Sequence, residues 1–209
     1  MDKKIINIFD ETEIQIISLY LADYGIKLHG RKIARLLASN HRTILLGLQR
    51  LEKKGILKQE HIGKNKMYFL NINNIITKSY IEIAEKARAI AILEKKFLLK
   101  RLAEELQFEA ITLVLFGSYA KAKEDEESDI DILIISDETG KRLNTIANKL
   151  REFEKTYHKT IQLQKTTAEQ FYRGLKEKDN LVLEIVKSHI LLSNGAMFVN
   201  FLWRYYYER

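Results

Sequence analysis

Hydrophobic residues near the N-terminus recur every three or four positions, which is the spacing of one helical face. The first such group is Ile14, Ile17, Leu21 and Tyr24. It predicts a helix for which Gly25 serves as the C-cap. Residues 31–38 predict a second, shorter helix with an inner face that consists of Ile33, Leu36 and Leu37.

The pattern then changes from helix to hairpin. Ser39 and Asn40 predict a turn and an N-cap for a third helix, which Gly55 ends. The inner face of this helix carries Ile44, Leu48 and Leu51. Two strand-like segments follow at residues 56–62 and 66–70, and the turn between them is Gly63-Lys64-Asn65.

A long helix is predicted over residues 74–94. Its apolar residues alternate four and three positions apart, as in a short coiled coil: Ile76, Tyr80, Ile83, Ala87 and Ile90. This face could pair with a second copy of the chain or pack on its own chain. Of the two we predict a homodimer, because a dimer would give the N-terminal segment two-fold symmetry.

The second half of the chain alternates strands and helices. The predicted helices cover residues 97–106, 140–157, 168–176, 181–188 and 197–207, and the predicted strands cover residues 113–116, 129–135, 160–165 and 190–192. This order predicts an α/β (α+β) fold in which helices flank a small mixed sheet.

The composition of the chain bears on its cellular location and on the kinds of site that it can form. The chain of 209 residues has no cysteine and no proline. We therefore expect no disulfide and no thiolate metal site, and a cytoplasmic location. No apolar run is long enough for a membrane span, so we expect no membrane association. The net charge of +7 indicates an anionic partner if the charge is clustered.

The basic residues are clustered between Lys27 and Lys66, where only Glu52 and Glu60 oppose them. Three helices followed by a basic hairpin resemble a winged helix-turn-helix, and the resemblance covers roughly residues 11–72. It implies that the third helix enters the major groove of double-stranded DNA. The residues expected to contact DNA are Arg31, His41, Arg42, Thr43, Gln49, Arg50, Lys53, Lys64 and Lys66. A protein-interaction module with a solvated basic face is the alternative.

Two motifs in the second half point to phosphate and metal chemistry. The apolar run 113–116 stops at Gly117-Ser118, where glycine permits a tight turn and Ser118 could cap a helix whose N-terminus suits a phosphate. Asp129 and Asp131 interrupt an Ile- and Leu-rich strand on one face, about 6.5 Å apart. Carboxylates are depleted in strands, and two at this spacing can share Mg²⁺ with substrate phosphates.

Gly117-Ser118, ten residues, and Asp129-x-Asp131 resemble the minimal nucleotidyltransferases of the polymerase-beta superfamily. The resemblance covers roughly residues 97–192. It implies that Asp129 and Asp131 ligate one or two Mg²⁺ ions and act in catalysis, and that Gly117, Ser118 and Lys121 bind a nucleoside triphosphate, with ATP the expected nucleotide. The predicted domains are a winged helix (1–74), a connecting helix (75–96) and a nucleotidyltransferase-like domain (97–209).

The sequence departs from that family at two places. Lys121-Ala122 stands where members often have Arg-Gly, which removes a bidentate phosphate contact. Gln162 stands where members have a third carboxylate, and an amide is neither an anionic ligand nor a base. Either another acid, such as Glu154 or Glu169, replaces it, or catalysis is weak or lost. The acidic run 124–127 is interpreted as a solvated loop.

Three functions therefore remain open. The chain could be a nucleotidyltransferase that its winged helix brings to DNA. It could be a transcriptional regulator whose nucleotidyltransferase domain is an inactive nucleotide sensor, which Gln162 favours. It could also be an antitoxin-like adenylyltransferase that acts on a partner protein, because the Gly-Ser and Asp-x-Asp motifs resemble those of such enzymes.

Overall fold

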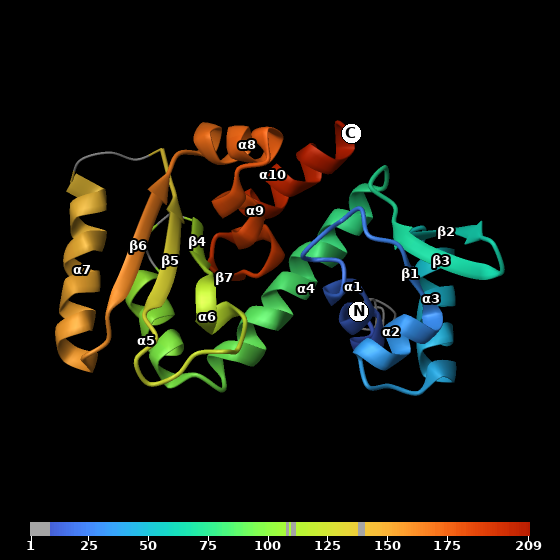
Figure 1. Ribbon diagram of the computed structural model, residues 1–209, viewed down its shortest axis with the longest axis horizontal. Coiled ribbons are helices and arrows are strands. Elements are labelled where there is room, and N and C mark those ends of the chain that lie inside the picture. Colours follow the sequence, from blue (N-terminus) through green and yellow to red (C-terminus); the bar gives the residue numbers. More distant parts are fainter. Residues whose placement is uncertain (1–8, 108, 110–111, 138–140) are drawn as a thin grey trace, which may run out of the picture. The chain divides into compact units, whose positions relative to one another are not determined.

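The computed structural model describes residues 9–107, 109, 112–137 and 141–209. The chain divides into two compact units. Unit 1 consists of Met1–Ala87 and Leu202–Arg209, and unit 2 consists of Arg88–Phe201. The two long helices α4 (Ile75–Leu93) and α10 (Gly195–Tyr207) each contribute residues to both units (Figure 1).

Unit 1 combines three short helices with a three-stranded sheet. Its elements before α4 are α1 (Glu11–Ser18), β1 (Leu28–His29), α2 (Gly30–Leu36), α3 (His41–Lys53), β2 (Leu57–Ile62) and β3 (Asn65–Leu70). The strands are antiparallel in the order β1-β3-β2, and β3 pairs with β2 from Leu57↔Leu70 to Ile62↔Asn65. The residues predicted to face inward from α3 (Ile44, Leu48 and Leu51) are fully buried, as expected.

The observed ends of these helices agree with the prediction from hydrophobic spacing at some positions and differ from it at others. The Asn40 side chain accepts a hydrogen bond from the Arg42 amide at 2.8 Å, which confirms the predicted N-cap of α3. The first helix ends at Ser18, not before Gly25, although Leu21 and Tyr24 are buried as predicted. The inward placement of Leu36 is wrong, because this side chain is 53% exposed at the last residue of α2. Burial of Leu21 and Tyr24 in a turn produces the same spacing as a helix.

The predicted coiled-coil face of α4 is divided between inside and outside. Tyr80 is buried, whereas Ile76, Ala87 and Ile90 are exposed. Ile81 and Ala84 are buried together with Tyr80. The helix was therefore predicted correctly, but its buried face is turned relative to the predicted one.

Unit 2 is built on a four-stranded mixed sheet in the order β6-β5-β4-β7. Its remaining elements are α5 (Phe97–Leu106), β4 (Thr112–Leu115), α6 (Gly117–Ala120), β5 (Ile130–Ile135), α7 (Lys141–Tyr157), β6 (Ile161–Thr166), α8 (Ala168–Glu177), α9 (Asn180–Lys187) and β7 (Ile190–Ser193). Strand β5 is parallel to β6 and antiparallel to β4, and β4 is antiparallel to β7. The fold is therefore the α+β type that the sequence predicts. The predicted start of α7 at Gly140 lies outside the described residues.

One face of this sheet is covered by α5 and α7. Leu102 and Leu106 of α5 and Leu150 of α7 belong to one buried cluster with Ile132 and Ile134 of β5. Because side chains alternate along a strand, Asp131 points to the opposite face of the sheet from Ile132. The apolar core thus fixes which face the carboxylate occupies. Among the described residues, no helix combines the length and apolarity needed to cross a membrane.

Candidate functional site

The Gly-Ser motif forms the turn between a buried strand and a single helical turn. All four residues of β4 are buried, and α6 begins directly after Phe116. Gly117 has a φ of +67°, a conformation that glycine adopts without strain. The N-cap of α6 is Phe116, so the predicted capping role of Ser118 is wrong, and Ser118 lies inside the helical turn.

Gly117 lies directly against the second carboxylate. A Cβ atom at this position would lie 1.8 Å from Oδ2 of Asp131 and 2.7 Å from its Cγ. The Phe116 amide also donates a hydrogen bond to the Asp131 carbonyl at 3.0 Å. The two motifs that the sequence separates by ten residues are therefore in contact, and only glycine leaves room for this approach.

The aspartate pair lies at the start of β5. The strand begins at Ile130, so Asp129 precedes it and Asp131 is its second residue. Both side chains are partly exposed, whereas Ile130 between them is fully buried. Burial raises the pKa of Asp131 above its ordinary value, and the neighbouring Asp129 carboxylate raises it further, while Lys121 acts in the opposite direction. The repulsion between the Asp129 and Asp131 carboxylates favours the binding of a cation between them.

Gln162 occupies the position at which the nucleotidyltransferase resemblance implies a third carboxylate. It pairs with Asp131 across the parallel strands β5 and β6. Its Nε2 atom donates a hydrogen bond to Oδ2 of Asp129 at 2.8 Å. The amide therefore holds one carboxylate in position but adds no negative charge.

Other acidic residues that could replace the missing third carboxylate are exposed on another element or already form hydrogen bonds or ion pairs. Glu154 accepts a hydrogen bond from the Ile161 amide at 2.8 Å, which fixes the start of β6, and Glu169 lies exposed in the first turn of α8. Glu124 forms an ion pair with Lys96 and its side chain is only 10% exposed. The interpretation of residues 124–127 as a solvated loop is therefore wrong for Glu124.

Sequence reasoning missed Glu184. Its Oε1 atom forms an ion pair with Nζ of Lys121 at 2.6 Å, and its charge contributes to the raised pKa of Asp131. Lys121 in turn lowers the pKa of Glu184. No motif marks this residue, because it lies on α9, far along the chain from Lys121.

These side chains fit a metal-bound triphosphate. Mg²⁺ is usually held by one or two protein carboxylates and completes its shell with water and substrate phosphates. Asp129 and Asp131 can supply those carboxylates, Lys121 can neutralise phosphate, and the absence of a side chain at Gly117 lets the Asp131 carboxylate lie directly against the turn. Within the described ranges, no three His, Cys, Asp or Glu side chains gather as a metal site.

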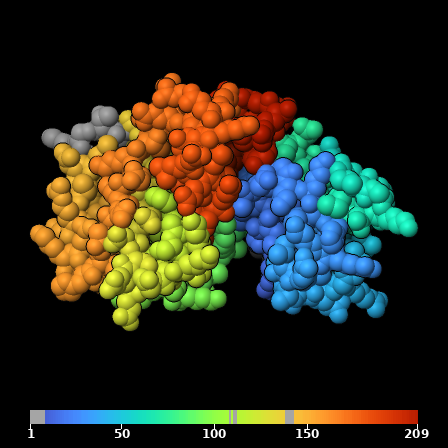
Figure 2. Space-filling model, in the orientation of Figure 1, coloured from blue at the N-terminus to red at the C-terminus, as the bar shows by residue number. Residues whose placement is uncertain are grey.

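A second candidate site lies in the N-terminal part of unit 1, which is coloured blue to cyan in Figure 2. A hollow of about 490 Å³ lies between the N-terminal ends of α2 and α3 and the β2–β3 turn. We call it the basic groove. Four of the predicted DNA contacts line it: Arg31, His41, Lys64 and Lys66. The N-terminal end of α3 and the β2–β3 turn thus line the same hollow.

The other predicted DNA contacts do not line the basic groove. Arg42, Thr43, Gln49 and Lys53 are exposed along α3. Arg50 is engaged within unit 1, because its Nε atom pairs with Oε1 of Glu13 at 3.0 Å and its Nη2 atom pairs with Oδ1 of Asp10 at 2.9 Å. Lys66 also pairs with Glu52 at 3.3 Å.

Comparisons with known proteins bear on part of the chain. No curated protein is similar enough to count as a relative. Among solved structures, the crystal structure of AF1382 from Archaeoglobus fulgidus is 19% identical, covers 45% of this chain and 99% of its own, and aligns with a TM-score of 0.33. Residues 96–191 match the family model of the nucleotidyltransferase domain. This stretch contains β4, the Gly117 turn and both aspartates, and its match supports a nucleotidyltransferase domain at these residues.

Proposed function

We propose that the chain is a DNA-binding nucleotidyltransferase that binds a nucleoside triphosphate with Mg²⁺, with ATP the expected nucleotide, and transfers the nucleoside monophosphate to an acceptor hydroxyl. The observation that carries the proposal is the contact of Gly117 with Asp131, which joins a turn suited to phosphate to a pair of carboxylates suited to a metal. The match of residues 96–191 to the nucleotidyltransferase domain supports it.

In this proposal each side chain has a separate task. The turn at Gly117 and Ser118 holds the terminal phosphates, and Lys121 neutralises part of their charge. Asp129 and Asp131 hold Mg²⁺, which when bound supplies positive charge to the triphosphate. The acceptor oxygen then forms a bond to the α-phosphorus and releases its proton to water, while the bond to the leaving pyrophosphate breaks. Positioning and charge neutralisation provide most of the catalysis in such transfers.

The test is incubation of the protein with α-labelled ATP and Mg²⁺. We expect label on the protein or on an added acceptor, and loss of the label in Asp129→Ala/Asp131→Ala. Glu105→Ala, which changes an exposed carboxylate on α5 of the same unit, is the control and should leave transfer unchanged. Transfer by the double variant at the rate of the unchanged protein would refute the assignment of this site.

A second function is favoured by Gln162. Its hydrogen bond to Asp129 keeps the carboxylate in place without providing a base. The domain would then bind nucleotide without transfer and serve as a sensor for the DNA-binding unit. Binding of ATP without transfer, together with transfer gained in Gln162→Glu, would favour the sensor over the enzyme.

We also propose that residues 1–74 form a winged helix that binds double-stranded DNA through the basic groove. The convergence of Arg31, His41, Lys64 and Lys66 on this groove supports the proposal. Phosphate-led binding weakens steeply with salt, so the affinity for duplex DNA should fall at least about ten-fold between 50 and 200 mM salt. Arg31→Ala and Lys64→Ala should each reduce this salt dependence, whereas Lys86→Ala on α4 should not. Salt-independent binding would contradict the proposal.

A further inference from the structure

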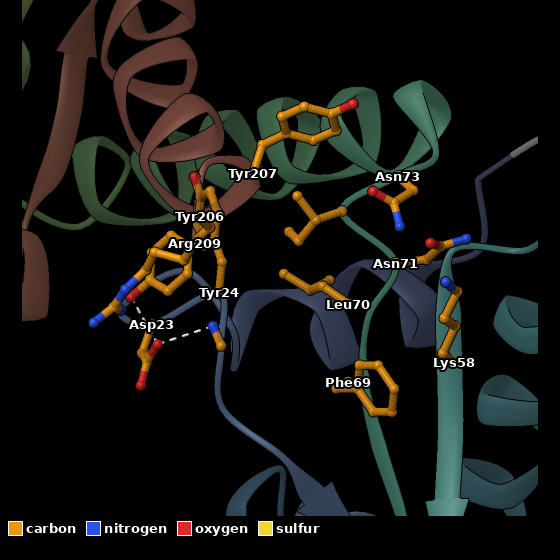
Figure 3. A pocket seen from close by; sticks show the side chains of 12 residues that line it. Asp23, Tyr24, Lys58, Phe69, Leu70, Asn71, Asn73, Tyr206, Tyr207 and Arg209 are labelled. Atoms are coloured by element: carbon orange, nitrogen blue, oxygen red, sulfur yellow. Dashed lines mark hydrogen bonds between the residues drawn. The ribbon is translucent and has the colours of Figure 1, made fainter.

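Unit 1 contains a second hollow, distinct from the basic groove, with a volume of about 560 Å³. We call it the aromatic hollow. Three segments that are far apart in the sequence form it: the turn at Asp23–Gly25, residues 69–73 at the end of β3, and the C-terminal end of α10, together with Lys58 of β2 (Figure 3). Its volume falls within the range of about 300–1,000 Å³ that small-molecule sites occupy.

Aromatic rings and aliphatic side chains form the apolar part of this hollow. In Figure 3 the rings of Phe69 and Tyr207 lie on opposite sides of Leu70. Tyr207 is 63% exposed, so its ring is accessible to a ligand and provides a stacking surface for a flat ring. The Phe69 ring forms part of the wall, and the Lys27 ammonium lies 5.2 Å from its centroid.

The charges of the hollow favour an anion. Lys58 and Arg209 both line it, and Figure 3 places them on opposite sides. The one acidic lining residue, Asp23, already accepts hydrogen bonds from the Tyr206 hydroxyl at 2.7 Å and from the Gly25 amide at 2.9 Å. These bonds fix its carboxylate at the edge and partly offset its charge. The amide side chain of Asn73 provides a further polar contact at the side where Lys58 lies, whereas Nδ2 of Asn71 already donates to the Gly55 carbonyl at 2.8 Å.

We propose that the aromatic hollow binds a small anion that carries a flat aromatic ring, of the size of a mononucleotide. The ring stacks against Tyr207, and its phosphate or carboxylate group lies at Lys58 or Arg209. This site is independent of the nucleotidyltransferase site, because all of its lining residues belong to unit 1.

The position of the hollow suggests what its occupant does. Tyr68 lines the basic groove, and the next residue, Phe69, lines the aromatic hollow. Strand β3 therefore contributes neighbouring residues to both hollows. A ligand against Phe69 therefore acts on the same strand that supports the groove.

The test uses Asp129→Ala/Asp131→Ala as the starting protein in buffer with EDTA, so that metal-dependent nucleotide binding in unit 2 does not contribute. Binding of AMP is followed by calorimetry and by the fluorescence of Trp203, the only tryptophan, which lies one helical turn before Tyr206 and Tyr207. Adenosine supplies the ring without charge, and inorganic phosphate supplies charge without a ring. 4-Hydroxybenzoate is a smaller aromatic carboxylate and tests whether a flat ring with a carboxylate is sufficient for binding.

We expect AMP or 4-hydroxybenzoate to bind saturably, and the compounds that lack the ring or the charge to bind at least about ten-fold more weakly. Tyr207→Ala and Lys58→Ala should each weaken binding about five-fold or more, and Lys86→Ala should leave it unchanged. Both altered side chains are exposed, so the fold should survive, which circular dichroism would check.

Three results would overturn the proposal. The first is no saturable binding of either anion up to about 5 mM, a limit that corresponds to about 3 kcal/mol. The second is binding that neither Tyr207→Ala nor Lys58→Ala weakens, because the ligand would then lie elsewhere. The third is equal affinity for adenosine and AMP, because the negative charge of the ligand would then contribute nothing to binding. None of these results depends on whether unit 2 transfers nucleotides.

Discussion

Each unit holds a carboxylate that is shielded from solvent, fully for Glu13 and partly for Asp131, but their neighbours differ. Glu13 of unit 1 is fully buried, and Arg50, Lys54 and the Tyr80 hydroxyl all bond to it at distances of 2.7 to 3.2 Å. Asp131 of unit 2 has another carboxylate, Asp129, as its close neighbour, and burial raises its pKa. The first carboxylate is neutralised by the protein, and the second is not.

The different neighbours of Glu13 and Asp131 indicate a structural role for Glu13 and a functional role for Asp131. A buried charge that cations already satisfy supports the fold and has little capacity for a ligand. A carboxylate that lies beside another carboxylate costs stability, and a bound cation can recover that cost. The environment of the charge, more than the residue type, therefore indicates where a metal belongs.

The largest effect on stability is expected from Glu13→Ala. The change leaves Arg50 and Lys54 without their shared partner, so unit 1 should lose about 3 kcal/mol of its free energy of unfolding. Urea unfolding followed by Trp203 fluorescence measures this loss. Glu11→Ala on the same helix is the control and should change stability by less than about 0.5 kcal/mol, because Glu11 is exposed. Equal effects of the two changes would contradict a structural role for Glu13.

Gly117→Ala should have the next largest effect. The new methyl group would collide with the Asp131 carboxylate and would also be strained at positive φ, so unit 2 should lose about 2 kcal/mol and nucleotide binding should fall with it. Gly63→Ala is a matched control, since Gly63 has a φ of +61° but no atom within 4 Å of an added Cβ. Its cost should be limited to about 1 kcal/mol of backbone strain. The pair separates collision from strain, and thermal unfolding measures both.

A smaller effect is expected from Asp131→Asn, and it should depend on pH. Because the folded protein raises the pKa of Asp131, protonated Asp131 stabilises unit 2 fully below the unfolded pKa, and this contribution is lost as pH rises through the folded pKa. The variant avoids this loss, so at pH 7 without metal it should be about 0.5 kcal/mol more stable than the unchanged protein. The difference should vanish in acid.

Addition of Mg²⁺ with ATP should make the unchanged protein more stable than Asp131→Asn. A ligand that binds only the folded protein raises the melting temperature, and Asp131→Asn should lose most of that increase. An equal increase in both proteins would show that the metal binds elsewhere.

The smallest change should follow Glu184→Gln. Removal of the Glu184 charge frees Lys121 for the phosphates, so the affinity for ATP with Mg²⁺ should rise about three-fold. Glu177→Gln on the exposed end of α8 is the control and should leave the affinity unchanged. Weaker binding in Glu184→Gln would instead indicate that Glu184 helps to hold the metal.

Much of the architecture could be predicted because the determinants are local. The N-cap at Asn40, the helical period of residues 97–106 and the apolar strand before Gly117 each depend on a few neighbouring residues. The end of α1 could not be predicted, because buried residues of a turn and of a helix share the same spacing. Strand β1 has only two residues, Leu28 and His29, and owes its existence to pairing with β3.

The sequence by itself determined the order of elements, the Gly-Ser turn, the aspartate pair and the basic cluster, because each depends on residue type and short spacing. Only the tertiary structure decided which groups meet: Gly117 with Asp131, Gln162 with Asp129, and Glu184 with Lys121. The same holds for Arg50, whose charge is directed to Glu13 and Asp10. Contacts between distant segments depend on strand register and on which helix face is buried, and neither is written in the spacing of a motif.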